Sequence, residues 1–170
     1  MNSVSLNCAV LTSSDTRTLE NDTSGQYLAD QLTEAGHQIK GREIIADDIY
    51  LLRAKVSEWI ADKSIDIVIV TGGTGFTNRD STPEALQVLF DKTISGFGEL
   101  FRQLSYDDIG SSTLQSRALG GIANNTLIFC LPGSTGACRL AWEKILAEQL
   151  NSQHRPCNFA ELIKNHSQSH

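Results

Sequence analysis

Three segments rich in glycine, serine and threonine carry the residue types that could do chemistry in this chain. They are residues 12–17, 71–80 and 131–137, with the sequences TSSDTR, TGGTGFTNRD and LPGSTGA. Because glycine has no Cβ, the backbone N–H groups of such segments can approach a phosphate group closely. One segment of this kind has the composition of any tight turn between a strand and a helix, but three of them together favour an anion-binding site.

The middle segment lacks the signatures of the common nucleotide-binding loops. Its glycines do not form GxGxxG, and no lysine follows them as in GxxxxGK[ST], which argues against a dinucleotide site and a P-loop. Instead Arg79 and Asp80 stand just before Ser81-Thr82-Pro83, where a helix is expected to begin. A carboxylate at this place can hold Mg²⁺ together with substrate phosphates, and an arginine can neutralise phosphate oxygens.

A second acidic point is the pair Asp47 and Asp48, which follows a predicted strand. One of the two carboxylates can cap the helix that begins next, which leaves the other free for a metal ion or a ligand. The residues themselves leave open which of the two has which role.

The elements that must position these residues alternate between strands and helices. Apolar, β-branched runs predict strands at residues 6–12, 38–46, 65–70, 118–122 and 126–131, and helical spacing predicts helices at residues 24–35, 50–61, 83–90, 98–104 and 134–150. This alternation predicts an α/β fold of three layers, a mostly parallel sheet with helices on both faces. Ligands of open α/β sheets bind beyond the carboxyl ends of the strands, where the three segments fall.

Length and composition limit the remaining choices. The chain has 170 residues, which favours one domain over residues 1–150, followed by a C-terminal arm and polar tail over residues 151–170. The net charge of −6 argues against nucleic-acid and anionic-membrane partners. The first residues show no signal-peptide pattern, and the four cysteines show no CxxC spacing, so we expect a cytoplasmic, reduced protein without a disulfide framework.

Apolar residues in two segments predict an assembly of several copies. The helix around Phe97, Leu100, Phe101 and Leu104 and the arm at residues 156–163 carry more apolar side chains than a solvated element needs. We therefore expect a closed, symmetric homo-oligomer.

The motifs also resemble a known family. Residues 71–75 with 79–85 (TGGTG and RDSTPEA) resemble the central motif of the MoaB/Mog family of molybdenum-cofactor biosynthesis proteins, and residues 131–137 resemble its second motif. Residues 96–99 and 113–118 resemble the stretch between the two, and residues 155–159 (RPCNF) are similar to the MoaB branch. The resemblance covers nearly the whole chain.

This resemblance implies a molybdopterin-binding domain that assembles as a trimer or a hexamer. It implies an Mg²⁺-dependent adenylyltransferase, which transfers the adenylyl group of ATP to molybdopterin and releases pyrophosphate; the alternative is a non-catalytic binding or assembly protein with the same pocket. Catalysis and Mg²⁺ binding map onto Asp47 and Asp80. The predicted substrate contacts are Ser13, Asp15, Gly72, Gly73, Thr74, Gly75, Arg79, Pro132, Gly133, Ser134 and Gly136.

Overall fold

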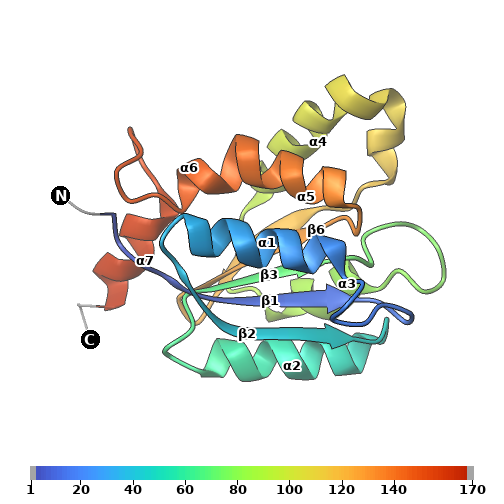
Figure 1. Ribbon diagram of the computed structural model, residues 1–170, viewed down its shortest axis with the longest axis horizontal. Helices are drawn as coiled ribbons and strands as arrows, with labels where there is room; N and C mark the ends of the chain where they lie inside the picture. The colour runs from blue at the N-terminus through green and yellow to red at the C-terminus, as the bar shows by residue number, and fades with distance from the viewer. Residues whose placement is uncertain (1–2, 168–170) are drawn as a thin grey trace.

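The computed structural model describes residues 3–167, in which one six-stranded sheet lies between two layers of helices (Figure 1). The order across the sheet is β2-β1-β3-β6-β5-β4. Strands β2, β1, β3 and β6 are parallel, β5 pairs antiparallel with β6, and β4 pairs antiparallel with β5. This confirms the predicted α/β fold with a mostly parallel sheet. The strands are β1 (Asn7–Ser13), β2 (Gln38–Ile45), β3 (Ile67–Thr71), β4 (Lys92–Thr93), β5 (Leu119–Ala123) and β6 (Thr126–Leu131).

Alternate side chains of the parallel strands fill two separate cores. In β1, Cys8 and Val10 pack under one layer of helices, whereas Ala9 and Leu11 pack under the other. Because both faces are covered, the central strands β1, β3 and β6 are buried at almost every position rather than at every second one, whereas the edge strand β2 is not. Helices α1 (Thr23–Glu34), α4 (Ser95–Ile109), α5 (Thr135–Ala141) and α7 (Phe159–Ser167) cover the first face, and α2 (Ile49–Ala61) and α3 (Thr82–Leu86) cover the second.

Several helices differ in length or type from the prediction. The single helix predicted over residues 134–150 is α5, a π-helical segment η3 (Trp142–Leu146) and α6 (Ala147–Gln149) in succession. The helix predicted over residues 83–90 ends at Leu86 and continues as the 3₁₀ turn η1 (Gln87–Leu89), and the one predicted over residues 98–104 is the longer α4, followed by the 3₁₀ segment η2 (Gly110–Gln115). Strand β4 was not predicted, because its two residues are defined only by their pairing with β5.

The carboxyl ends of the central strands lie in register. Thr12 of β1 pairs with Thr71 of β3, which pairs with Leu131 of β6. The three glycine- and hydroxyl-rich segments therefore leave the sheet side by side, at the right of Figure 1, while both ends of the chain lie at the left. The turn between β5 and β6 is made by Asn124 and Asn125, whose φ values of 48° and 63° are left-handed, a conformation that asparagine tolerates.

The C-terminal arm packs onto the sheet at the opposite edge. Ala160 and Ile163 of α7 are buried in the core of the chain itself rather than left on an assembly surface, whereas Leu162 is exposed. Residues 168–170 of the predicted tail lie outside the described part. No helix within residues 3–167 is long and apolar enough to cross a membrane.

The apolar surface predicted for α4 needs a correction. Phe97 and Phe101 are buried, and Phe97 packs on Phe129 of β6 with ring centroids 4.9 Å apart. These two side chains complete the core of the chain itself and leave Leu100 as the large exposed side chain of that group. The homo-oligomer stays a prediction.

Candidate functional site

A cavity of about 600 Å³ opens at the carboxyl edge of the sheet. It is bounded by the loops that follow β1, β2, β3 and β6 and, on one side, by α4 and η2. Of the thirteen residues predicted for the site, eleven line it: Ser13, Asp15, Asp47, Gly72, Gly73, Thr74, Gly75, Asp80, Pro132, Gly133 and Ser134. Arg79 and Gly136 are not among its lining residues.

The turn after β3 depends on two glycines with left-handed backbone. Gly72 has φ 101° and Gly73 has φ 71°, and a Cβ at either position would stand 2.4 Å from another atom, the Ser13 carbonyl oxygen or Thr82 Oγ1. Thr82, the first residue of α3, donates from its hydroxyl to the Gly72 carbonyl at 2.7 Å and from its N–H to the Gly73 carbonyl at 3.0 Å. The turn is therefore fixed from behind by α3.

Arg117 holds the next part of the same loop. Its N–H donates to the Thr74 carbonyl at 3.0 Å, and its guanidinium donates to the Gly75 carbonyl at 2.9 and 2.7 Å. The backbone N–H groups of residues 73–75 donate to no group within residues 3–167. Because the carbonyl groups of the loop are engaged elsewhere, its unpaired N–H groups can donate hydrogen bonds to a bound anion.

The two neighbouring aspartates at the end of β2 have different roles. Asp48 accepts hydrogen bonds at 2.9 Å from the N–H groups of Tyr50 and Leu51, so it caps α2. Asp47 instead lines the cavity and accepts a hydrogen bond at 2.6 Å from the Ser13 hydroxyl. Burial raises the pKa of Asp47, and the Ser13 hydrogen bond opposes that rise.

Asp80 reaches the cavity from the far end of the loop after β3. Its Oδ2 accepts hydrogen bonds from the N–H and the hydroxyl of Thr77, at 2.9 and 2.8 Å. A Cβ on Gly75 would stand 2.8 Å from this oxygen, which explains the third glycine of the loop. Oδ1 of Asp80 and Oδ2 of Asp47 have no hydrogen-bond donor in the described part of the chain, so each carboxylate keeps one oxygen for a ligand.

Asp15 connects two of the loops at the rim of the cavity. It accepts two hydrogen bonds at 2.8 Å, from Arg79 Nε and Nη2, and a third at 3.0 Å from the N–H of Asp47. The Arg79 hydrogen bonds hold the pKa of Asp15 down to about 2. Arg79, predicted as a ligand contact, is thus the ion-pair partner of another predicted residue.

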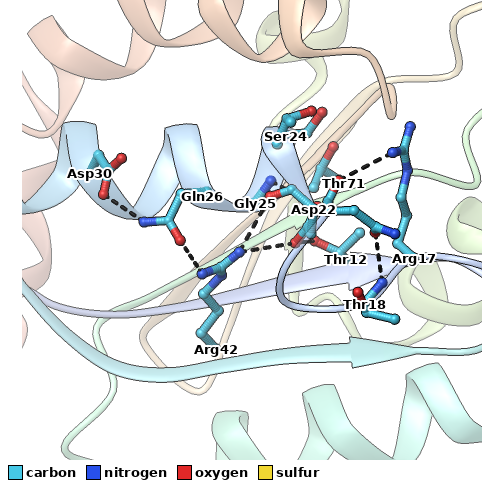
Figure 2. A network of polar contacts seen from close by, with 12 residues as sticks. Thr12, Arg17, Thr18, Asp22, Ser24, Gly25, Gln26, Asp30, Arg42 and Thr71 are labelled. Atoms are coloured by element: carbon cyan, nitrogen blue, oxygen red, sulfur yellow. Dashed lines mark hydrogen bonds and ion pairs between the residues drawn. The ribbon is translucent and has the colours of Figure 1, made fainter.

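The floor of the cavity depends on a polar network around Asp22 (Figure 2). The Asp22 carboxylate is almost fully buried and accepts hydrogen bonds from the Thr12 hydroxyl at 2.7 Å and the Gly25 N–H at 3.1 Å. Arg42 of β2 lies 3.4 Å from the same carboxylate and also donates to Gln26. The network fixes the end of β1 and the start of α1.

Sequence reasoning did not place three groups of cavity residues. The floor residue Thr12 begins the segment at residues 12–17, and Asp22 follows it, but a helix cap explains Asp22 equally well. Arg17 lies in the same segment and is a possible anion contact, but surface arginines are common. The wall from α4 and η2 was not assigned to the site, although residues 113–118 resemble the family, because only the fold brings it over the cavity. Its lining residues are Phe101, Ser105, Ile109, Ser112, Gln115 and Ser116.

The donor atoms of the cavity fit a divalent ion such as Mg²⁺ when a substrate supplies part of its coordination. No group of three or more His, Cys, Asp or Glu side chains able to hold a metal ion occurs within residues 3–167. The described residues therefore do not supply a complete set of ligands for a metal ion. The free oxygens of Asp47 and Asp80 are hard donors of the kind that bind Mg²⁺ when substrate phosphates supply the other ligands.

Comparisons with known proteins identify what the chain is similar to. Residues 9–152 match the family described as "Probable molybdopterin binding domain". Molybdenum cofactor biosynthesis protein B of Escherichia coli K12 is 54% identical over 156 residues, which is 92% of each chain.

Solved structures agree with these matches. A crystal structure of molybdenum cofactor biosynthesis protein B superposes with a TM-score of 0.89 and 40% identity over 99% of this chain and 100% of the other. A tungsten cofactor synthesizing protein, MoaB from Pyrococcus furiosus, gives a TM-score of 0.74 and 34% identity over 85% of this chain and 92% of the other.

Proposed function

Since the chain belongs to the molybdopterin-binding family of molybdenum-cofactor biosynthesis proteins, we propose that it binds molybdopterin at the carboxyl edge of its sheet and adenylylates it with ATP and Mg²⁺. The observation that carries the proposal is the pair Asp47 and Asp80. Each aspartate is fixed through one oxygen and presents the other to a cavity lined by unpaired backbone N–H groups.

The proposed reaction is a direct transfer between two bound substrates. A terminal phosphate oxygen of molybdopterin attacks the α-phosphorus of ATP in line, the new P–O bond forms, and the bond to the β-phosphate breaks so that pyrophosphate leaves. No covalent bond to the protein is needed. In agreement with this, Cys138, the cysteine closest to the loops, has its thiol pKa raised to about 11 by burial and is a poor nucleophile.

The chain's own contribution is positioning and neutralisation of charge. The N–H groups of residues 73–75, which have no acceptor within residues 3–167, would donate to phosphate oxygens, and the hydroxyl of Ser13 orients Asp47. The wall of α4 and η2 shields one side of the cavity from water. Mg²⁺, when bound, would offset the negative charge of the ATP phosphates. Asp47 and Asp80 would hold it.

The test is to incubate the protein anaerobically with molybdopterin and ATP, with Mg²⁺ or with EDTA, and to measure adenylylated molybdopterin and pyrophosphate. We expect both products in equal amounts and only with Mg²⁺. Asp47→Asn is expected to cut the rate strongly, whereas Asp48→Asn, changed at the helix cap, serves as the matched control. If the wild-type protein binds molybdopterin but forms neither product, the proposed adenylyltransferase activity is wrong.

One observation favours the second candidate, a non-catalytic molybdopterin-binding or assembly protein. Arg79, which the motif predicts as a phosphate contact, instead donates hydrogen bonds from Nε and Nη2 to the Asp15 carboxylate. A binding protein would show the same affinity for molybdopterin with and without Mg²⁺ and ATP. The same incubation distinguishes the two functions.

A further inference from the structure

The cavity is poor in positive charge for a site that would take phosphates. Four carboxylates line it, those of Asp15, Asp22, Asp47 and Asp80. Among the residues that the structure describes, Arg17 is the one lysine or arginine in the lining. The whole chain carries a net charge of −6, so the surrounding field does not attract an anion either.

The other arginines near the cavity already have partners. Arg79 makes the bidentate pair with Asp15 and is absent from the lining. Arg42 lies against Asp22 beneath the floor. Arg117 donates to the Gly75 carbonyl and pairs with Glu84. Each of these guanidinium groups stabilises the loops through its bonds to a carboxylate or a carbonyl, and its charge is already partly neutralised by that partner.

Arg17 differs from them in its contacts. Its backbone is fixed, because its N–H donates to Ser14 Oγ at 3.0 Å. Its guanidinium makes one hydrogen bond, from Nη1 to the Asn21 carbonyl at 3.2 Å, and it has no ion pair with any carboxylate of residues 3–167. In Figure 2 the side chain extends beside Asp22 and Thr71, the floor of the cavity.

Arg17 also stands where two cavities meet. Together with Ser14 it lines both the main cavity and a neighbouring one of about 510 Å³, which is bounded by the loop after β1 and by β2. A group bound at Arg17 therefore has space on either side for the rest of a large ligand.

From these contacts we propose that Arg17 binds a phosphoryl group of the substrate, whereas Arg79 serves as the structural partner of Asp15. A guanidinium with most of its N–H donors free matches two oxygens of a phosphate at once. The inference rests on the proposed function in one respect, that the ligand carries phosphate. A nucleoside triphosphate and a phosphate monoester such as molybdopterin share this chemistry.

The experiment is titration calorimetry of the full-length protein with ATP and, separately, with molybdopterin, each in EDTA and in Mg²⁺. We expect Arg17→Ala to raise the Kd at least tenfold for one of the two ligands and Arg17→Lys to restore part of the loss. Arg79→Ala is expected to have a smaller effect than Arg17→Ala. Arg155→Ala, an exposed arginine far along the chain, controls for the loss of one charge, and circular dichroism confirms the fold of every variant.

The outcomes separate the proposals. A loss confined to ATP, or one confined to molybdopterin, supports the proposal and names the ligand at Arg17. An Arg17→Ala affinity within twofold of wild type for both ligands overturns it, as does a larger loss in Arg79→Ala or a wild type that binds neither ligand. If Arg17 controls binding but no adenylylated product forms, the proposed reaction fails and the assignment of Arg17 holds.

Discussion

The two edges of the sheet use their polar groups in opposite ways. At the amino edge, Asp66 is buried and accepts hydrogen bonds from the Asn7 N–H at 2.8 Å and from Lys164 Nζ at 2.9 Å. At the carboxyl edge, Asp47 and Asp80 form no ion pair with a lysine or arginine of residues 3–167. A carboxylate whose charge is neutralised within the chain stabilises the fold, and one left without a cation can bind a metal ion or a ligand.

The same contrast extends to the backbone and to neighbouring side chains. At the amino edge the Leu6 N–H donates to Nδ1 of His37, and the Thr126 hydroxyl donates to the Ile65 carbonyl. A cavity of about 290 Å³ exists there too, but its carboxylate, that of Asp66, is already paired with Lys164. The two cavities therefore differ in whether their carboxylates have a cation within the described chain.

The largest effect is expected at the carboxyl edge. Asp80→Asn keeps the shape of the side chain but removes its charge, which we expect to matter more in the transition state than for ground-state binding. The adenylylation rate should fall on the order of a hundredfold, about 2.7 kcal/mol, while molybdopterin affinity changes little. Rate and affinity are measured on the same preparation. An equal loss in both would place Asp80 in ground-state binding instead.

The next largest effect is expected at the amino edge and on stability alone. Asp66→Ala leaves the Asn7 N–H and the Lys164 ammonium without their acceptor, so the free energy of unfolding should fall by about 2 kcal/mol. Asp108→Ala, at an exposed position of α4, should change it by less than about 0.5 kcal/mol. Urea unfolding measures both. A loss of ligand binding in stable Asp66→Ala would contradict the division between the edges.

Two glycines allow a matched comparison of the edges. Gly36 at the amino edge (φ 90°) and Gly73 at the carboxyl edge (φ 71°) are both left-handed, but a Cβ meets nothing within 4 Å at Gly36. Replacement by Ala should cost about 1 kcal/mol of stability at Gly36 through backbone strain, and more at Gly73, where the Cβ also meets Thr82 Oγ1. Only Gly73→Ala is expected to weaken molybdopterin binding, by roughly tenfold. Equal molybdopterin affinities in the two variants would show that the glycine loop is not part of the binding site.

The smallest effect concerns pH. Burial lowers the pKa of His37, and the nearby charge of Asp66 opposes that shift only in part. Because the unfolded chain then binds a proton more readily than the folded one, stability is complete above the ordinary histidine pKa of about 6.5 and is lost as the pH falls below it. His37→Gln should flatten this part of the stability profile. Identical profiles for wild type and His37→Gln would refute the assignment.

Much of the fold follows from local patterns, because both faces of the parallel strands are buried. The apolar run at residues 65–70 predicts a central strand for that reason, and the segments that follow such strands must meet at one edge. Local patterns left open the choice between Asp47 and Asp48, which the family resemblance alone assigned to Asp47. Both are acidic and both precede a helix, and only the backbone of the turn decides which of them caps it.

The contacts that complete the candidate site join residues far apart in the chain. The pair of Asp15 and Arg79 spans 64 positions, and no local pattern encodes it. The same is true of the wall from α4 and η2, whose residues show ordinary helical spacing. For this reason the predicted arginine contact, Arg79, differs from Arg17, the arginine of the cavity lining that has no ion pair within residues 3–167. The fold sets the partners of both.

The anchoring of the glycine loop by Arg117 has a consequence for the order of events during synthesis. The Gly75 carbonyl and its arginine are separated by 42 positions, with β4, α4 and η2 between them. As a chain emerges from the ribosome, β1, β2 and β3 can pair long before Arg117 has been made. The loop then lacks the donor that turns its carbonyl groups away from the cavity. The sheet can thus assemble early, while the anion-binding geometry forms only after the β5–β6 hairpin has been translated and docked.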